Sequence, residues 1–291
     1  MLEIEPRPVD VPSMRATLPM PIEVPRQIEA FFEAQEAAAE PPVELEGVPL
    51  AGVDIFEGLP RKVLERLAAG AGVLQLAQDE EVSSFGAALV LSGAAVVCAT
   101  IVDAAAHWPS PAELLVANGT LSDGIALRVV GAEGGATVAV WSRDFLDELL
   151  SRHAANQNKA RARGDHLQAL SGATMGPFGE LDDDDRNALA VELTVRCLMP
   201  GEIWIEDGAP APAIVLVGAG SVELYGPISE ETNETVDPGM LVFPDLVGLG
   251  GDASSSVRAG PGGALLLLAD RATSDRMCAR VPDLAERLRD V

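Results

Sequence analysis

The sequence is poor in cations, and this shortage excludes a class of function. Its 291 residues hold 20 Lys and Arg against 45 Asp and Glu, a formal net charge of −25, and lysine occurs only at Lys62 and Lys159. A nucleic-acid-binding surface attracts phosphates with Lys and Arg, so we expect no nucleic-acid partner. Solubility explains the acidity most simply, and attraction of a basic protein partner is the alternative.

Cysteine and histidine are also scarce. Cys98, Cys197 and Cys278 are too few and too widely spaced for a disulfide framework or a zinc site, and they favour reduced thiols in the cytoplasm. The three histidines have no metal-ligand spacing. The acidic run Asp182–Asp185 lacks the EF-hand pattern and suits the first turn of a helix. With no recognisable catalytic motif, we expect no metal, no cofactor and no enzymatic activity.

Long apolar runs are absent as well. The longest run, Ala264–Ala269, is far shorter than the ~20 residues of a membrane-spanning helix. No basic segment followed by an apolar core opens the chain, so we expect no signal peptide. These features predict a cytoplasmic protein without a membrane span, and the abundance of Arg, Ala and Gly suggests a bacterial, GC-rich genome.

What the chain does contain is an internal repeat. With 48% apolar and only 4% aromatic residues, Val, Leu, Ile and Ala must fill the core, and the length predicts about two domains. One constant offset pairs Phe56 with Phe178, Leu59 with Leu181, Leu67 with Leu189, Val73 with Val195, Leu76 with Leu198 and Glu80 with Glu202. At shifted spacing, Ser92-Gly93 matches Ala219-Gly220 and Gly119 matches Gly239. A repeat of about 120 residues indicates a domain duplication rather than a solenoid.

Short apolar runs separated by Gly, Pro and Asp predict strands in each copy. In the first copy they are Val73–Leu76, Ala87–Leu91, Ala94–Val102, Leu114–Ala117, Ile125–Leu127 and Ala136–Trp141. In the second they are Thr194–Leu198, Ile203–Ile205, Ile214–Val217, Ser221–Tyr225, Glu234–Val236, Met240–Phe243, Ser256–Ala259 and Ala264–Ala269. Helices are expected near residues 61–69, near 143–150 with Ser142 as N-cap, at 181–193, and up to Ala279 with Thr273 or Ser274 as N-cap. A last helix is expected to restart at Val281-Pro282-Asp283-Leu284, with Pro in its first turn, and to end at Leu288. The predicted class is mainly β with flanking helices.

The domain boundaries follow from composition. Residues 1–48 form a Pro-rich tail with one helix at Gln27–Glu40, whose Phe31 and Phe32 suit either a docking helix or a transient one. We expect a first domain at residues 49–152, a helical connector at 153–172 and a second domain at 173–291.

The second copy carries a family resemblance. A helix, a β segment, the turn Pro200-Gly201-Glu202, the apolar run Ile214–Val217 and Gly220 follow in the order typical of the front half of a cyclic-nucleotide-binding domain. The resemblance covers roughly residues 50–291 and implies two β-jelly-roll domains in tandem. In that family a Gly-rich turn and a short helix offer backbone N–H groups to the cyclic phosphate, an Arg pairs with it, and a Glu holds the ribose hydroxyl.

Both copies depart from that binding pattern. In the first, Gly124 stands at the Glu position and Gly134 at the Arg position, while the apolar landmarks Ala126, Leu127, Ala136 and Thr137 remain. In the second, Asp245 stands at the Glu position and Ala253 at the Arg position, followed by Ser255 and Ser256. The nearest cations, Arg128 and Arg258, are expected to point elsewhere.

The missing arginine decides the functional prediction. Leaving a desolvated charge unpaired costs roughly 2–5 kcal/mol, about 30- to several-thousand-fold in affinity. We therefore expect a non-enzymatic tandem protein that has lost cyclic-nucleotide binding and acts as a protein-interaction, scaffolding or regulatory module. The alternative is a sensor that binds a cyclic nucleotide or another small ligand in one remodelled pocket. A protein partner is expected, a homo-oligomer is left open, and no helix-turn-helix is expected after the second copy.

Overall fold

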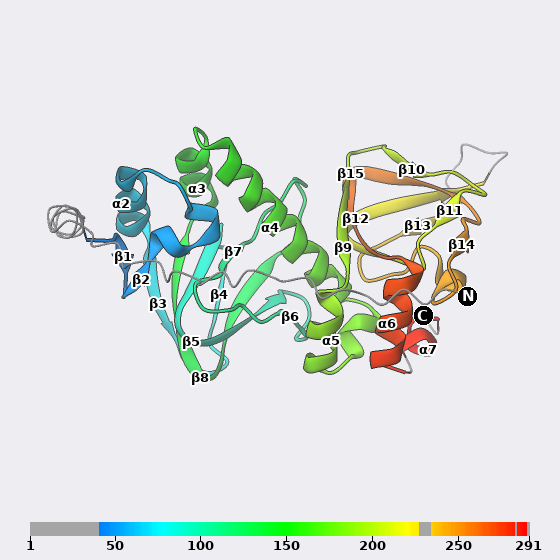
Figure 1. Ribbon diagram of the computed structural model, residues 1–291, viewed down its shortest axis with the longest axis horizontal. Helices are drawn as coiled ribbons and strands as arrows, with labels where there is room; N and C mark the ends of the chain where they lie inside the picture. Colours follow the sequence, from blue (N-terminus) through cyan, green and yellow to red (C-terminus); the bar gives the residue numbers. More distant parts are fainter. Residues whose placement is uncertain (1–40, 227–233, 283, 290–291) are drawn as a thin grey trace, which may run out of the picture. The chain divides into compact units, whose positions relative to one another are not determined.

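Two long antiparallel strand pairs organise the fold. In the computed structural model, which describes residues 41–226, 234–282 and 284–289, β5 (Ala87–Ala99) pairs with β8 (Leu127–Trp141), and β12 (Ile214–Tyr225) pairs with β15 (Ser256–Ala269) (Figure 1). The shorter strands are β1 (Glu44–Leu45), β2 (Val48–Pro49), β3 (Gly72–Leu76), β4 (Glu81–Ser83), β6 (Ala105–His107), β7 (Leu114–Val116), β9 (Thr194–Leu198), β10 (Ile203–Ile205), β11 (Pro210–Ala211), β13 (Glu234–Val236) and β14 (Gly251–Asp252). The predicted helix at Gln27–Glu40 lies outside the described residues.

The helices are α2 (Arg61–Gly70), α3 (Arg143–Leu150), α4 (Ala154–Ala173), α5 (Asp183–Ala190), α6 (Arg271–Arg280) and α7 (Leu284–Arg289), with short 3₁₀ turns η1 (Leu50–Gly52), η2 (Asp54–Phe56), η3 (Pro177–Glu180) and η4 (Pro244–Leu246). Ser142 caps α3, as predicted, because its hydroxyl accepts the Phe145 N–H. The cap predicted at Thr273 or Ser274 is wrong: the Asp270 carboxylate caps α6 by accepting the Thr273 N–H at 2.7 Å.

Each long pair contributes to two layers of a roll. β3 pairs with the second half of β8 and β7 with the first half of β5, whereas β4 pairs with the first half of β8 and β6 with the second half of β5. The later pair is built likewise, with β9 and the bridge Leu216–Leu241 at one half, and β10 and β13 at the other. These are two antiparallel jelly rolls in tandem, so the predicted fold class is confirmed. Below they are called the N-terminal roll (β3–β8) and the C-terminal roll (β9–β15).

The rolls bend at glycines. The β5–β8 register shifts on both sides of Gly93 and the β12–β15 register on both sides of Gly220, and these residues have φ values of 77° and 71°. A bulge at a left-handed glycine bends a strand without ending it. The sequence prediction placed separate strands on either side of such glycines, and it is wrong there because each pair of predicted strands is one continuous strand. The strand predicted at Met240–Phe243 is reduced to a single bridge.

Both surfaces of the central strands are buried. In β5, Ala87 and Leu89 pack with the helices, while Ala88 and Val90 pack inside the N-terminal roll. β12 alternates in the same way, with Leu216 toward the helices. Strands buried on both faces appear in sequence as uninterrupted apolar runs, which explains why these segments show no polar alternation.

The repeat predicted from sequence is visible in the turns. The carboxylate of Glu80 accepts the Ala77 N–H at 3.0 Å, and that of Glu202 accepts the Met199 N–H at 2.9 Å, each three residues back. The pairing of Gly119 with Gly239, however, is wrong. Gly239 (φ 88°) lies two residues before Leu241, which forms the bridge to Leu216 of β12. The corresponding residue of the N-terminal roll is Ala112 (φ 62°), two residues before Leu114, which pairs with Leu89 of β5.

Helix α4 packs against both rolls. It contacts β6 and β7 of the N-terminal roll and β12 and β15 of the C-terminal roll. Its approach to β12 is so close that a Cβ on Gly172 would lie 1.4 Å from the Gly218 carbonyl oxygen. Arg186 on α5 makes a second link: it is 4% exposed, donates to the carbonyl oxygens of Ala105, Phe178, Gly179 and Leu181, and lies over the Trp108 ring.

None of the helices in the described ranges combines the length and the apolar character that a membrane crossing requires.

Candidate functional site

The predicted binding positions of the first copy divide between two hollows. Gly124, Ala126 and Leu127 line one of ≈ 640 Å³, whereas Gly134 and Thr137 line another of ≈ 430 Å³, together with Ala136. The cause is β8, which runs without a break from Leu127 to Trp141, through the residues between two strands that were predicted as separate, and carries Gly134 away from Gly124. The structure therefore does not bring these six positions into one site.

The larger hollow, here the loop hollow, is lined by Ser83–Gly86, Thr100, Ala117–Asn118, Ser122–Leu127 and Arg143. Sequence analysis missed Arg143, which stands directly after the helix cap Ser142. Its guanidinium donates to the Asn118 side-chain oxygen at 3.5 Å and lies 3.6 Å from the Asp147 carboxylate. Both distances are long, so Arg143 is held weakly.

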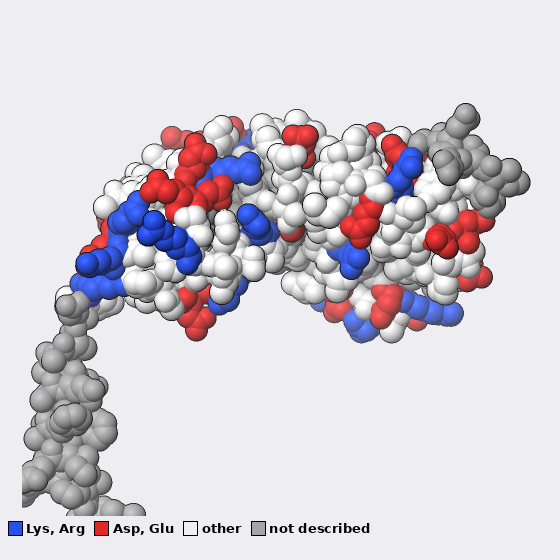
Figure 2. All heavy atoms as spheres, turned by 90° about the horizontal axis from the view of Figure 1, so that it is seen from above, with Lys and Arg blue, Asp and Glu red and all other residues white. Residues whose placement is uncertain are grey.

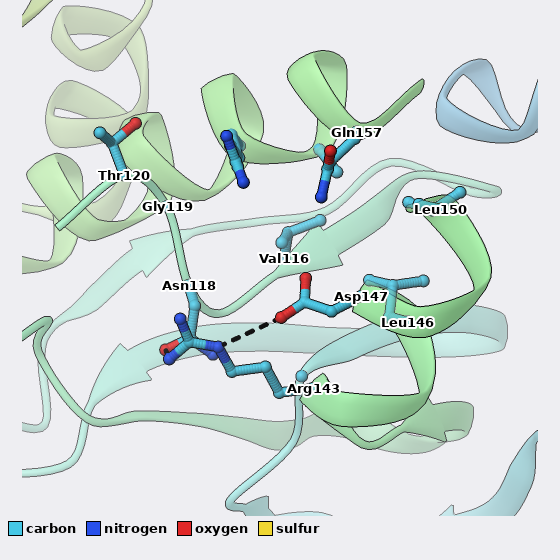
Figure 3. A pocket seen from close by; sticks show the side chains of 12 residues that line it. Val116, Asn118, Gly119, Thr120, Arg143, Leu146, Asp147, Leu150 and Gln157 are labelled. Atoms are coloured by element: carbon cyan, nitrogen blue, oxygen red, sulfur yellow. Dashed lines mark hydrogen bonds and ion pairs between the residues drawn. The ribbon is translucent and has the colours of Figure 1, made fainter. Parts of the chain in front are cut away.

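A second cavity of ≈ 410 Å³, here the helix pocket, lies between α3, α4 and residues 116–120 (Figure 3). Arg143, Asn118 and Gly86 line both cavities. The apolar part of its lining is buried and consists of Val116, Leu146, Leu150 and Ala160. Its polar part consists of Asn118, Thr120, Arg143, Asp147, Gln157 and Arg161.

Polar side chains from α4 bind the loop between the two cavities. Asp165, 8% exposed, accepts the Thr120 N–H at 2.6 Å and the Thr120 hydroxyl at 2.7 Å. Gln168, 2% exposed, accepts the Ile125 N–H and donates to the carbonyl oxygens of Ala117 and Ile125. The loop thus gives two of its backbone donors to the helix behind it.

The glycines of this loop are required by that contact. A Cβ on Gly119 would lie 2.0 Å from the Asp165 carboxylate, and a Cβ on Gly124 would lie 2.8 Å from the Gln168 side-chain oxygen. The close packing of Gln168 therefore explains glycine at position 124 without reference to a ligand.

The two nearest cations point elsewhere, as expected. Arg128 forms ion pairs of 2.6 Å with Glu81 and with Asp103, and lines a different hollow. Arg258 pairs with Glu223 at 2.6 Å and lies over the Tyr225 ring, 5.4 Å from its centroid. Each guanidinium is engaged by an acidic side chain.

The positions singled out in the second copy are dispersed. Asp245 lies exposed in η4, while Ala253 is 3% exposed and packs in the interior of the C-terminal roll. The Ser255 hydroxyl donates to the Ser254 carbonyl oxygen, and the buried Ser256 hydroxyl accepts the Asp207 N–H at 2.9 Å. A side chain as long as arginine has no room at Ala253 without displacing apolar neighbours.

A separate polar cluster fastens α4 to β6 and β7. The Glu113 carboxylate binds the ring of His107 at 2.9 Å, the guanidinium of Arg163 at 2.7 Å and the Ser110 N–H at 2.9 Å. Burial alone would raise the pKa of Glu113, but these hydrogen bonds and the charges of His107 and Arg163 outweigh it and lower the pKa to about 2. Burial, with His107 and Arg163 nearby, lowers the pKa of His166. We assign this cluster a structural role.

Within the described residues, no group of His, Cys, Asp or Glu side chains is arranged to hold a metal ion.

No protein-family model and no curated protein matches the sequence. Solved structures with a similar fold include the regulatory domain of Toxoplasma gondii PKA crystallised with cAMP, at 14% identity and a TM-score of 0.34, covering 82% of this chain and 92% of that one. The regulatory subunit of a cAMP-independent PKA from Trypanosoma cruzi, bound to guanosine, has 16% identity and a TM-score of 0.36, and the match covers 83% of this chain and 87% of that one. The catabolite activator protein of Thermus thermophilus has 24% identity and a TM-score of 0.35, and the match covers 38% of this chain and 54% of that one. Such identities and TM-scores transfer none of those proteins' properties to this chain.

Proposed function

We propose that this protein is a non-enzymatic regulatory protein of a bacterial cytoplasm. Its two cyclic-nucleotide-binding-like rolls no longer bind a cyclic nucleotide and act through contact with a protein partner. The observation that carries the proposal is the binding of the loop by α4. The Thr120 and Ile125 N–H groups belong to the segment in which the family resemblance implies the phosphate-binding turn, and they donate to Asp165 and Gln168 of α4.

Electrostatics supports the same conclusion. A phosphate at Thr120 would have to displace the Asp165 carboxylate or lie beside it, and two negative charges in a partly desolvated site repel each other. The cations that sequence analysis considered as substitutes, Arg128 and Arg258, would have to leave ion pairs of 2.6 Å. Losing a charged partner in this way costs roughly 2–5 kcal/mol. This penalty raises a micromolar Kd by about 30- to several-thousand-fold, above the concentration that such a ligand reaches in a cell.

Isothermal titration calorimetry with cAMP and with cGMP tests the loss of binding. We expect no heat of binding for either ligand at concentrations up to about 1 mM. The Asp165→Ala variant, which frees the Thr120 donors, is titrated with the same ligands for comparison. Micromolar binding of either nucleotide to the unaltered protein would refute the proposal.

The interaction part needs its own experiment. Affinity capture of the tagged protein from its native host, followed by chemical cross-linking and mass spectrometry, should give one protein partner in stoichiometric amount. Capture of no protein above the background of an unrelated protein of equal charge would contradict a scaffolding role.

A second candidate function is a sensor for another small ligand, and Arg143 favours it. Its guanidinium reaches both cavities and is weakly held, so an incoming anion does not have to break a strong ion pair. A thermal-shift screen with metabolites separates the two candidates. A rise in melting temperature that is lost in Arg143→Gln supports the sensor.

A further inference from the structure

We propose that the helix pocket binds a small organic anion that carries an apolar group, held by the guanidinium groups of Arg143 and Arg161. This inference deepens the second candidate function by naming a ligand class and a place. It concerns the cavity between α3 and α4 and requires no phosphate at the loop donors of Thr120.

The charge of the lining supports an anion. The chain as a whole carries −25, yet the lining of this pocket contains two arginines and only one carboxylate, Asp147. Figure 2 shows Lys and Arg side chains gathered over the part of the surface that holds α2, α3 and the first turns of α4, with Asp and Glu side chains among them. Two arginines against one carboxylate give the lining an excess of positive charge, which favours an anion over a cation.

The arginines are available to a ligand. In the described part of the chain, no hydrogen bond or ion pair joins the Arg161 guanidinium to another side chain or backbone group. Among the residues that the structure describes, the Arg143 guanidinium has two long contacts, to Asn118 and Asp147, and the Asp147 side chain is 62% exposed to solvent. A guanidinium offers up to five N–H donors in a planar fork that matches a carboxylate or phosphate group.

The apolar part of the pocket selects for an apolar group. Leu146 and Leu150 from α3 line it beside Val116 and Ala160, and the side chains of Gln157 and Asn118 lie at its polar side (Figure 3). A cavity of ≈ 410 Å³ is near the lower end of the range of small-molecule sites. It suits a ligand of fragment size rather than a nucleotide chain or a peptide.

The consequence of binding would be regulatory. A ligand that bridges Arg143 on α3 and Arg161 on α4 would fix the angle between the two helices. Because α4 also binds the loop through Asp165 and packs on the C-terminal roll, the bound state would be communicated to both rolls.

Hexanoate, hexanol and hexylamine make a set of six-carbon probes with an anionic, a neutral and a cationic head group. We expect hexanoate to shift the methyl NMR signals of Leu146 and Leu150 with a Kd below about 1 mM, while hexanol and hexylamine bind at least about tenfold more weakly. Equal binding of hexanoate and hexylamine would overturn the proposal, because the cavity would then recognise only the alkyl chain.

Substitutions test the arginines. Arg143→Gln and Arg161→Gln should each weaken hexanoate binding about tenfold, the loss expected for one charge-assisted hydrogen-bonded pair that is partly exposed. Arg152→Gln removes an equal charge from an exposed turn outside the lining and should leave the Kd unchanged. Asp147→Asn removes the competing carboxylate and should strengthen binding several-fold. An equal loss in the Arg152 variant would show a general charge effect and refute the site.

Circular dichroism of each variant confirms folding, which we expect to persist because Arg143, Arg152 and Arg161 are all exposed. The result is independent of the nucleotide titrations. Failure of hexanoate to bind overturns only the pocket assignment, whereas binding of cAMP overturns the proposed function.

Discussion

Replacing Asp165 with alanine tests how the loop is held. The carboxylate is 8% exposed and accepts two hydrogen bonds from Thr120, at 2.6 and 2.7 Å. A hydrogen bond to a charged group contributes roughly 1.5–3 kcal/mol. Thr120 itself is exposed, so water replaces part of the loss. We expect Asp165→Ala to lower the free energy of unfolding by about 2–3 kcal/mol.

Urea denaturation measures the free energy of global unfolding, and amide hydrogen exchange measures the local stability of the loop. The Thr120 amide should lose protection in Asp165→Ala, while amides in the middle of β5 keep theirs. Asp147→Ala is the matched control, since its carboxylate is 62% exposed and 3.6 Å from its partner. Exposed pairs contribute less than about 1 kcal/mol.

A double-mutant cycle with Thr120→Val isolates the contact to the hydroxyl, for which we expect a coupling of about 1 kcal/mol. If Asp165→Ala changes stability by less than about 0.5 kcal/mol and leaves the Thr120 amide protected, the carboxylate does not hold the loop. The argument against phosphate binding would then lose its basis.

Four further predictions concern α4 and its surroundings. Gln168→Leu leaves three backbone groups without partners and should lower stability by about 2–4 kcal/mol in urea. Gly172→Ala should destabilise by about 3 kcal/mol or more in thermal unfolding despite the better helix propensity of alanine, because its Cβ meets the Gly218 oxygen. Arg186→Met strips four carbonyl oxygens of a donor and should cost about 3 kcal/mol by denaturation. The folded pKa of Glu113 is about 2 against 4.5, so it stabilises by roughly 3 kcal/mol above pH 4.5 and less as the pH falls toward 2; Glu113→Gln should flatten that part of the stability–pH curve.

The fold was largely predictable because it rests on local signals. The helix starting at Arg61, the cap at Ser142 and the strand Thr194–Leu198 come from periodicity and end residues. Strand continuity was not predictable, since Gly93 is equally suited to ending a strand and to bending it. Only the pairing with β8 distinguishes the two.

The site was much less predictable, because its contacts join distant segments. Asp165 and Gln168 fall in the stretch predicted as a helical connector, yet both are buried against a loop some 45 residues earlier. A buried helix face made of polar residues has no apolar periodicity to reveal it. Arg143 carried one signal, its place at the start of a capped helix beside Asp147, but nothing in the sequence connects it to Asn118.

The sharing of α4 limits how this protein can evolve. Ala160 and Leu167 belong to the core of the N-terminal roll, and Ala169, Leu170 and Ala173 to that of the C-terminal roll. One helix therefore supplies core residues to both rolls. If recombination replaced one roll with that of a homologue, the new roll would also have to pack against the half of α4 that belongs to the core of the other roll. We therefore expect the two rolls to be inherited, and to diverge, as a pair.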